Sequence, residues 1–366
     1  MRAVSRRPLI FAAVALAAGC SNGTSEPAPG PSSTATASAS VPPSASGSAA
    51  APPAPAPPPS DAGSEAGGPD DDPMAHHFET KEELLALFSI KRPPKPDSNA
   101  DGFLQKSFGP GSPALINQGN KALAKHSISK AKCLAGLQGI TLQTEEQKAI
   151  CGGFENMVPV WKRGKKNKPK YCIDIFEFPN KPCELPLVWV APVQAKVICE
   201  LQGKRLCSQE EWTLSCNADP DGGKPSKFAY GDEMDLEVCN SNKPAATYGP
   251  GCEAKSATTA WKTCSTNTEP AGSFPKCRSR FGVFDLHGNV AEIMTRLDED
   301  GHTYDQLKGS AFFYVDVARG PNERPPKGRE TYPDHCAYDP RWHVELMTEA
   351  WHNNYHLGFR CCKSVK

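Results

Sequence analysis

Short hydrophobic segments separated by polar ones begin near residue 150 and continue to the C-terminus. Residues 157–161 are almost entirely apolar, and residues 171–177 alternate apolar and polar side chains as a half-buried strand does. Residues 307–313 form another mostly apolar segment after a polar one. We expect a strand from each of these three segments.

Two helices are predicted between these strands. Residues 192–202 carry apolar side chains at helical spacing, with Pro192 at the start and Gly203 placed to end the helix. Ser208 and Glu211 have the spacing of a capping box, in which each side chain accepts a hydrogen bond from the other residue's backbone amide. The second helix is therefore expected to begin directly after Ser208.

The residues before 150 carry weaker helical patterns. Residues 79–88 have the pattern of a short amphipathic helix that starts at Thr80, and residues 114–131 have helical spacing. Cys133 and Cys151 flank a further predicted helix and are placed to pair with each other. None of these segments contains a motif that indicates a chemical activity.

Residues 281–296 combine apolar positions with two carboxylates and a tight turn. Asp285 and Glu292 flank the turn at residues 287–289, whose glycine and asparagine both tolerate a positive φ. Such a turn can aim carboxylate and carbonyl oxygens at one point, and an all-oxygen cluster suits a hard cation such as calcium. The alternative is a plain turn between two core segments, with Glu292 solvated.

The first 20 residues are typical of an export signal. Three arginines precede an apolar stretch at residues 9–18 that is too short to span a membrane. The stretch ends in Ala-Ala-Gly-Cys, which resembles a bacterial lipoprotein signal, in which cleavage precedes a cysteine that becomes lipidated. We expect residues 1–20 to be this signal; the alternative is an ordinary secretory signal or one retained as an anchor.

Cys20 is the expected lipidation site, where several acyl chains, palmitate among them, would give stable anchoring. The chain is then a lipoprotein of the bacterial cell envelope, with its folded part in the periplasm or at the cell surface. Ser21 follows the lipidated cysteine, and a serine there favours the outer membrane over the inner membrane.

Residues 21–75 consist almost entirely of Pro, Ala, Ser, Gly and Thr, and they have too little apolar bulk to offset the entropy cost of ordering. We interpret them as a disordered linker between the membrane and the folded part. Residues 76–150 form a helical prelude, and residues 151–366 form the main domain.

The net charge of the chain is zero, so its composition does not indicate the positively charged surface that nucleic-acid binding requires.

The cysteines indicate an oxidising compartment. Setting Cys20 aside from the 15 cysteines leaves 14, an even number in a chain expected to leave the cytoplasm, which favours disulfides. No two cysteines have C-x-x-C spacing, so zinc ribbons and thioredoxin-like redox sites are not expected.

Six segments of the main domain form an ordered set of motifs. They are YCIDIFE at 171–177, AKVICELQGKRLCSQEEW at 195–212, FAYGD at 228–232, FGVFDLHGNVAE at 281–292, KGS at 308–310 and GFR at 358–360. In this order they resemble ID-x-[YF]-E, A-x-x-x-C-x-x-x-G-K-R-L-x-[TS]-E-x-E-W, [YF]-P-[WY]-G, [FY]-G-L-Y-D-M-x-G-N-V-x-E-W, R-G-G-S and G-F-R of the formylglycine-generating enzyme (sulfatase-modifying factor) family. The resemblance covers roughly residues 151–366, and six ordered motifs are far more specific than one.

The resemblance implies the family's variant of the C-type-lectin-like fold. This is a loop-rich α+β domain with short twisted antiparallel strands, two helices and disulfide cross-links. The resemblance also implies that Cys199 pairs with Cys361 and that Cys216 pairs with a C-terminal cysteine, for which Cys336 is the candidate. Cys207 and Cys362 are additional cysteines, as in a cysteine-rich branch of the family, and the sequence leaves their partners open.

Calcium is the cofactor that the resemblance implies. In family members with calcium, one site lies on the turn, and its ligands here would be the side chains of Asp285 and Glu292 with the carbonyls of Gly288 and Val290. A second family site uses an asparagine after the Y-G motif, for which Asn240 is the candidate. We therefore expect calcium in a structural role.

The catalytic cysteines of the family are replaced in this chain. Oxidase members use a copper-binding cysteine pair after R-G-G-S, and the corresponding positions here are Phe313 and Ala318. Neither can supply a thiolate to Cu(I), and Phe313 would fill the space where the substrate thiol and the metal meet. We therefore expect no copper and assign no catalytic residue. His352 and His356 have the i, i+4 spacing of helical metal ligands, but the two asparagines between them favour a loop.

Two functions remain open at this point. The first is a non-catalytic, lipid-anchored binding module with a protein or glycan ligand, by analogy with C-type-lectin-like folds. The second is a divergent enzyme of the same family that modifies a peptide or small molecule by altered chemistry. True formylglycine generation ranks last, because it would need two reduced cysteines elsewhere in the chain.

Overall fold

The computed structural model describes residues 71–75, 77–78, 81–90, 116–162, 165, 168–243, 266–313, 335–339 and 345–365. All of them belong to one compact unit, Gly63–Lys366. The predicted signal with Cys20 and the linker as far as residue 70 lie outside the described residues, as do Cys252, Cys264 and Ala318. Within the described part of the chain, no helix is both long and apolar enough to cross a membrane.

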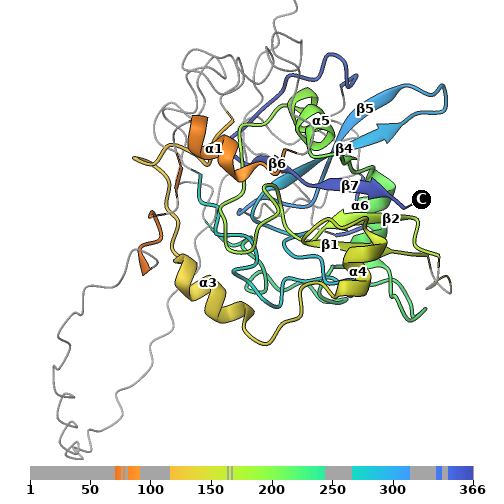
Figure 1. The fold of residues 1–366 in the computed structure, drawn as a ribbon, viewed down its shortest axis with the longest axis horizontal. Helices are drawn as coiled ribbons and strands as arrows, with labels where there is room; N and C mark the ends of the chain where they lie inside the picture. The colour runs from red at the N-terminus through yellow and green to blue at the C-terminus, as the bar shows by residue number, and fades with distance from the viewer. Residues whose placement is uncertain are drawn as a thin grey trace, which may run out of the picture. The chain divides into compact units, whose positions relative to one another are not determined.

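The described residues form a mixed helix and sheet structure with long connecting loops (Figure 1). The helices are α1 (Lys81–Leu87), α3 (Lys130–Leu137), α4 (Glu145–Ile150), α5 (Pro192–Leu201) and α6 (Gln209–Asn217). The strands are β1 (Met157–Val160), β2 (Tyr171–Asp174), β3 (Arg205–Leu206), β4 (Ala291–Leu297), β5 (Thr303–Lys308), β6 (Leu357–Phe359) and β7 (Cys361–Ser364). The α+β class expected from the sequence is confirmed.

The strands form two small sheets that meet at the C-terminus of the chain. One sheet has the antiparallel order β1-β2-β7-β3, and the other has the order β5-β4-β6, in which β4 and β6 are parallel. β6 belongs to one sheet and β7 to the other, and Arg360 is the single residue between them. The side chain of Arg360 therefore starts where the chain passes from one sheet to the other.

The core lies on both faces of β4. Ala291 and Ile293 pack into a cluster with α1, α5 and β6, whereas Met294 packs with β1, β2 and α6. In Figure 1, α4 lies beside β1, and α5 and α6 lie near β4, as their contacts require. Because α1 contributes Leu84 and Leu87 to this core, the segment before the main domain packs against it.

Six disulfides join the described residues. They are Cys133–Cys183, Cys151–Cys172, Cys199–Cys361, Cys207–Cys362, Cys216–Cys336 and Cys239–Cys277. The third and fifth are the two pairs that the resemblance implies. The expectation that Cys133 pairs with Cys151 is wrong, because β2 brings Cys172 next to Cys151, and the loop after it brings Cys183 next to Cys133.

Both helices expected in the main domain are confirmed. α5 begins at Pro192, and Gly203 follows it with a φ of 78°. α6 begins after Ser208, whose hydroxyl oxygen accepts from the amide of Glu211 at 3.3 Å, while the carboxylate of Glu211 accepts from the amide of Ser208 at 2.9 Å. The sequence predicts these helix starts and ends correctly because each depends on residues within one turn of the helix.

The prediction of a helix at residues 114–131 is wrong. Residues 116–129 are not helical, and α3 begins only at Lys130. The backbone of Asn117 pairs with Val188 instead, with N–O distances of 3.3 and 2.8 Å. Gly119 has a φ of 99°, and a Cβ on it would lie 2.8 Å from the Cβ of Thr266. Tertiary contacts therefore override the helical pattern here.

The strand expected at residues 307–313 is confirmed only at its start. β5 ends at Lys308, because Gly309 has a φ of 72° and turns the chain out of the sheet. A side chain at this glycine would meet the carbonyl of Leu286 at 2.8 Å. Residues 309–313 therefore form an irregular segment that packs against the turn of residues 285–289 rather than continuing the strand.

Candidate functional site

The turn at residues 285–289 is packed tightly against the loop that contains Asn240. Asp285, Gly288 and Asn289 all have positive φ values, of 55°, 75° and 58°. The backbone carbonyl of Asn240 accepts from the amide of Asn289 at 2.7 Å, and a Cβ on Gly288 would lie 2.4 Å from that same oxygen. Glycine at position 288 is therefore required by this close approach.

Arg360 occupies the centre of the site, behind this turn. Its Nε donates to the two carboxylate oxygens of Glu292 at 2.8 and 2.7 Å, and its Nη2 also bonds to Glu292. The remaining donors reach the carbonyls of Asp174 at 3.0 Å, Ile175 at 3.2 Å and Phe284 at 2.9 Å. Arg360 is completely buried, so these bonds replace all of its hydration.

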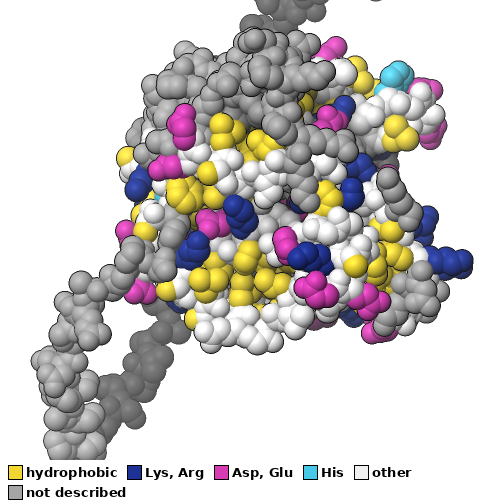
Figure 2. All heavy atoms as spheres, viewed as in Figure 1, with side chains coloured by type: hydrophobic (Ala, Val, Ile, Leu, Met, Phe, Trp, Pro, Cys, Tyr) yellow, Lys and Arg dark blue, Asp and Glu magenta, His cyan; other side chains and the backbone are white. Residues whose placement is uncertain are grey.

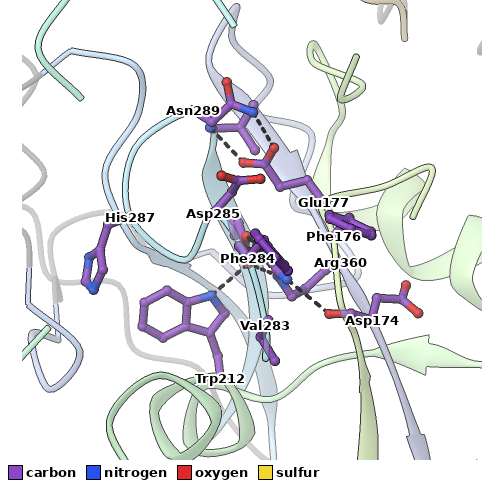
Figure 3. Close-up of polar contacts among 12 residues, drawn as sticks. Asp174, Phe176, Glu177, Trp212, Val283, Phe284, Asp285, His287, Asn289 and Arg360 are labelled. Carbon is purple, nitrogen blue, oxygen red and sulfur yellow. Dashed lines mark hydrogen bonds and ion pairs between the residues drawn. The ribbon is translucent and has the colours of Figure 1, made fainter. Parts of the chain in front are cut away.

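Glu177 holds the far side of the turn. Its Oε1 accepts from the amide of Val290 at 3.0 Å, and its Oε2 accepts from the side-chain amide of Asn289 at 2.6 Å. Figure 3 shows the side chain of Asn289 bonded to Glu177, with the carboxyl group of Asp285 next to it. Glu177 therefore fixes the turn in the conformation that the positive φ values require.

Glu177 and Asp285 form a buried pair of carboxyl groups. Burial raises the pKa of Asp285 to about 7 and raises the pKa of Glu177 well above its ordinary value, where Asp285 adds to the increase. Oδ2 of Asp285 accepts from the amide of Gly272 at 2.7 Å. Three carboxyl groups thus surround one guanidinium, and protons offset the excess negative charge.

The two carboxylates that the resemblance offers to calcium, Asp285 and Glu292, are bonded to protein donors. Glu292 is bound to Arg360 and accepts from the indole nitrogen of Trp212 at 2.7 Å. The side-chain amide of Asn240 donates to Oδ1 of Asn289 at 2.9 Å. Calcium on Asp285, Gly288, Val290 and Glu292 would require Glu292 to leave Arg360, so these residues do not fit the ion as they are arranged. Calcium binding at this turn stays a prediction.

Two groups of described residues place three potential metal-ligating atoms close together, and neither contains Asp285 or Glu292. The first is Cys216, His287 and Cys336, in which both cysteines are already joined in a disulfide. The second is Asp298, Asp300 and His302, at the exposed turn between β4 and β5. The acidic turn of residues 285–289 is thus a centre of protein hydrogen bonds.

Phe313, which the resemblance places at the first copper-binding cysteine of the oxidase members, lies in the core. Phe313 is 3% exposed and packs its ring against Phe312, Tyr355 and His356 at centroid distances of 5.3, 6.3 and 5.4 Å. The second position, Ala318, lies outside the described residues. His352 and His356 lie on an irregular segment and not on a helix, as the asparagines between them indicated.

A cavity of about 560 Å³ lies beside α6, away from the buried turn. Its lining combines the apolar side chains of Leu214 and Ala337 with the charged side chains of Lys162, Lys170, Glu210 and Asp339. No local sequence pattern predicts this cavity, because β2, α6 and the segment around residue 337 form it together. It offers a ligand both apolar contact and charges of either sign.

Glu177 and Arg360 are functional residues to which no role was assigned from the sequence. Both lie inside motifs that were identified, since Glu177 ends the segment at 171–177 and Arg360 ends GFR. A charged residue at the end of a mostly apolar motif is the signal that was available. Asp174, in the same segment, forms a buried ion pair with Lys204 at 2.6 Å.

The sequence of residues 144–365 matches the family described as FGE-sulfatase, "Sulfatase-modifying factor enzyme 1-like domain", over more than half of the chain. The chain belongs to this family. The match begins before the boundary expected at residue 151, so the FGE-type domain also includes α4 (Glu145–Ile150).

Two solved structures are similar to the chain. One, described as "Crystal Structure of CarF", has a TM-score of 0.34 and 12% identity, and the match covers 57% of this chain and 94% of that one. The other, described as "Major Tropism Determinant P3c Variant", has a TM-score of 0.28 and 10% identity, over 57% of this chain and about half (52%) of that one. The comparison with curated proteins found no match.

Proposed function

We propose that this protein is a non-catalytic binding module built on an FGE-type domain and anchored by lipid at Cys20 to the bacterial cell envelope. The observation that carries the proposal is the buried ring of Phe313 at the position where oxidase members of the family have a copper-binding cysteine. A phenyl ring cannot coordinate Cu(I), and its packing against Phe312 and Tyr355 leaves no thiol at that place.

The cysteines of the described residues support the same proposal. All twelve of them are joined in six disulfides, so none of them is available as a thiolate. Copper-dependent oxidation of a substrate thiol needs a thiolate pair to hold Cu(I), and this part of the chain offers no such pair. The described part of the domain therefore keeps the family scaffold and contains no free cysteine pair for copper.

The binding surface that we propose is the cavity beside α6. Its lining includes Leu214 and Ala337 as apolar contacts, with lysines and carboxylates around them. Figure 2 shows one face of the molecule, on which Lys and Arg side chains are interspersed with Asp and Glu. A ligand of mixed charge, either a protein segment or a glycan with charged groups, suits such a lining better than a polyanion does.

The absence of copper chemistry is tested with the full-length protein, purified without a polyhistidine tag. Cu(I) is titrated against a chromogenic chelator, and a peptide carrying a cysteine is followed by mass spectrometry for loss of its thiol. We expect no copper taken from the chelator and no change in the peptide. Binding of one copper per chain with turnover would overturn the proposal, and turnover without copper would favour the divergent enzyme.

The binding surface is tested on peptide and glycan arrays with wild type and the Leu214→Arg variant, which introduces a large cation into the cavity. We expect ligands that bind the wild type to lose at least about tenfold in affinity for the variant. Leu134→Arg is the matched control, because Leu134 is exposed on α3 and does not line this cavity. Equal loss in both variants, or no loss in either, would place the binding surface elsewhere.

A further inference from the structure

A pair of buried histidines lies outside the family domain. His77 is 4% exposed and His126 is 7% exposed, and their ring centroids are 5.2 Å apart. Both residues precede the family match, which begins at residue 144. The pair is therefore a feature of this chain's own prelude and not of the FGE-type domain.

The tautomer of His126 is fixed by the backbone. Its Nδ1 lies 2.6 Å from the carbonyl oxygen of Thr268, and a carbonyl oxygen can only accept, so Nδ1 carries the proton. Nε2 is then the bare nitrogen, and it has no hydrogen-bond partner among the described residues. A histidine that donates from one nitrogen to a carbonyl and keeps the other bare is arranged as metal-ligating histidines are.

The surroundings keep His126 neutral. His126 is buried and donates from Nδ1 to a carbonyl, and a charged side chain close to it is that of Lys243. Lys243 is itself paired with Glu269, so the neighbourhood adds no net charge. The hydroxyl oxygen of Thr268 is also buried and has no partner in the described part of the chain, so it is available to a metal-bound water.

The separation of the two rings fits a shared ion. A metal–nitrogen bond of about 2.0–2.1 Å, extended by about 1.2 Å to the ring centre, places two imidazoles on a tetrahedral ion with centroids roughly 5.2 Å apart. The observed separation is 5.2 Å. Imidazole nitrogen favours Zn²⁺, Cu²⁺ and Ni²⁺ over calcium or magnesium.

We propose that His77 and His126 form a two-histidine site for such a borderline divalent ion, with water completing the coordination. The ion would tie the segment before the family domain to its core. That segment is already held beside the site, because the amide of Phe78 donates to the buried side chain of Gln118 at 2.7 Å. His77 is thereby positioned by its neighbour in the chain.

The test is calorimetric titration of the full-length, untagged protein with Zn²⁺ after treatment with a chelator. We expect the wild type to bind one equivalent that His126→Ala and His77→Ala both lose, or bind at least about tenfold more weakly. The control is His302→Ala, which removes a histidine from the exposed group with Asp298 and Asp300 and is expected to keep that equivalent. Near-ultraviolet circular dichroism shows whether each variant folds.

A second readout does not depend on the variants. Electron paramagnetic resonance of the wild type with one equivalent of Cu²⁺ is expected to show hyperfine coupling to imidazole nitrogens. If His126→Ala does not fold, His77→Ala and this spectrum decide the question. Zinc binding that is unchanged in His77→Ala, or a wild type that binds no zinc and gives a copper spectrum without nitrogen coupling, would overturn the proposal.

Discussion

Arg360 holds the carboxylate of Glu292 at 2.7 and 2.8 Å from its Nε, in the interior of the domain where the chain passes from β6 to β7. The two residues are separated by 68 positions in the sequence and belong to segments that the family motifs place far apart. Arg360 also binds the carbonyl of Asp174 in β2 and that of Phe284, directly before the turn. This ion pair therefore connects the two sheets to the acidic turn.

Replacing Arg360 by lysine is expected to destabilise the domain strongly. Lysine cannot keep the bidentate contact or reach the three carbonyls, so Glu292 would remain buried without its partner. The expected loss in the free energy of unfolding is about 3–5 kcal/mol, measured by denaturant titration. Arg296→Lys is the matched control: Arg296 lies 3.8 Å from Asp339 at the partly exposed surface, and its replacement is expected to cost under about 1 kcal/mol. Similar losses in the two variants would contradict the role of Arg360.

The stability of the domain is expected to depend on pH through Asp285. Its pKa is raised from 3.8 to about 7 in the folded state, so the folded protein binds a proton there that the unfolded chain has already released. The contribution of Asp285 to the free energy of unfolding therefore falls as the pH rises through this window and levels off above about 7, while Glu177, whose pKa is also raised, adds a decrease in the same direction. Denaturant titrations at several pH values measure this slope.

Asp285→Asn is the variant that isolates this effect. An asparagine keeps an oxygen for the amide of Gly272 and offers an amide donor to Glu177, so it resembles the protonated acid. We expect the variant to fold and to show a smaller decrease in stability between pH 4 and 7 than the wild type, because the proton on Asp285 and the effect of Asp285 on the pKa of Glu177 are both removed. The account would be contradicted by a variant with the same pH dependence as the wild type.

Calcium is expected to have little effect on stability, because Glu292 is already bound to Arg360 and Trp212. A specific ion at one hundred times its dissociation constant would add about 2.7 kcal/mol to the free energy of unfolding. We expect the unfolding temperature at pH 8 to change by less than about 1 °C between excess calcium and a calcium chelator. An increase of several degrees in the unfolding temperature with calcium would support the calcium site that the resemblance implies.

The adjacent disulfides Cys199–Cys361 and Cys207–Cys362 are expected to act together. Each closes a long loop alone, with sequence separations of 162 and 155. Once one of the two bonds is formed, the other bond closes a much smaller loop. That loop contains only the residues from Cys199 to Cys207 and from Cys361 to Cys362. Replacing either pair by alanines is expected to cost about 2–3 kcal/mol, and replacing both is expected to cost more than the sum, by on the order of 1 kcal/mol. Simple additivity in denaturant titrations would show that loop closure does not govern these bonds.

The parts of the fold that the sequence predicts are those set by neighbours in the chain. The capping box of Ser208 and Glu211 and the helix that starts at Pro192 depend on residues within one turn, and both are confirmed. The helical pattern at 114–131 fails because Asn117 pairs with Val188 and Gly119 packs against Thr266, two contacts that lie far along the chain.

The candidate site was predicted in part for the same reason. The turn at 287–289 follows from its glycine and asparagine, and both have the positive φ that their residue types allow. Its partners Glu177 and Arg360 come from segments 112 and 68 positions away from the residues they bind. Local patterns cannot show that Arg360 rather than an ion neutralises Glu292, because that depends on how the two sheets meet.

The most direct test of the central proposal, that this FGE-type domain works without a redox cysteine pair, is a count of reactive thiols. The full-length protein is alkylated under native conditions and again after unfolding, digested without reduction, and each cysteine after Cys20 is mapped by mass spectrometry. We predict that none of the twelve cysteines in the six pairs is alkylated in either state, that these pairs are recovered as disulfide-linked peptides, and that Cys252 and Cys264 do not react in the folded protein. Two reactive thiols in the folded protein would contradict the claim and revive an oxidase function.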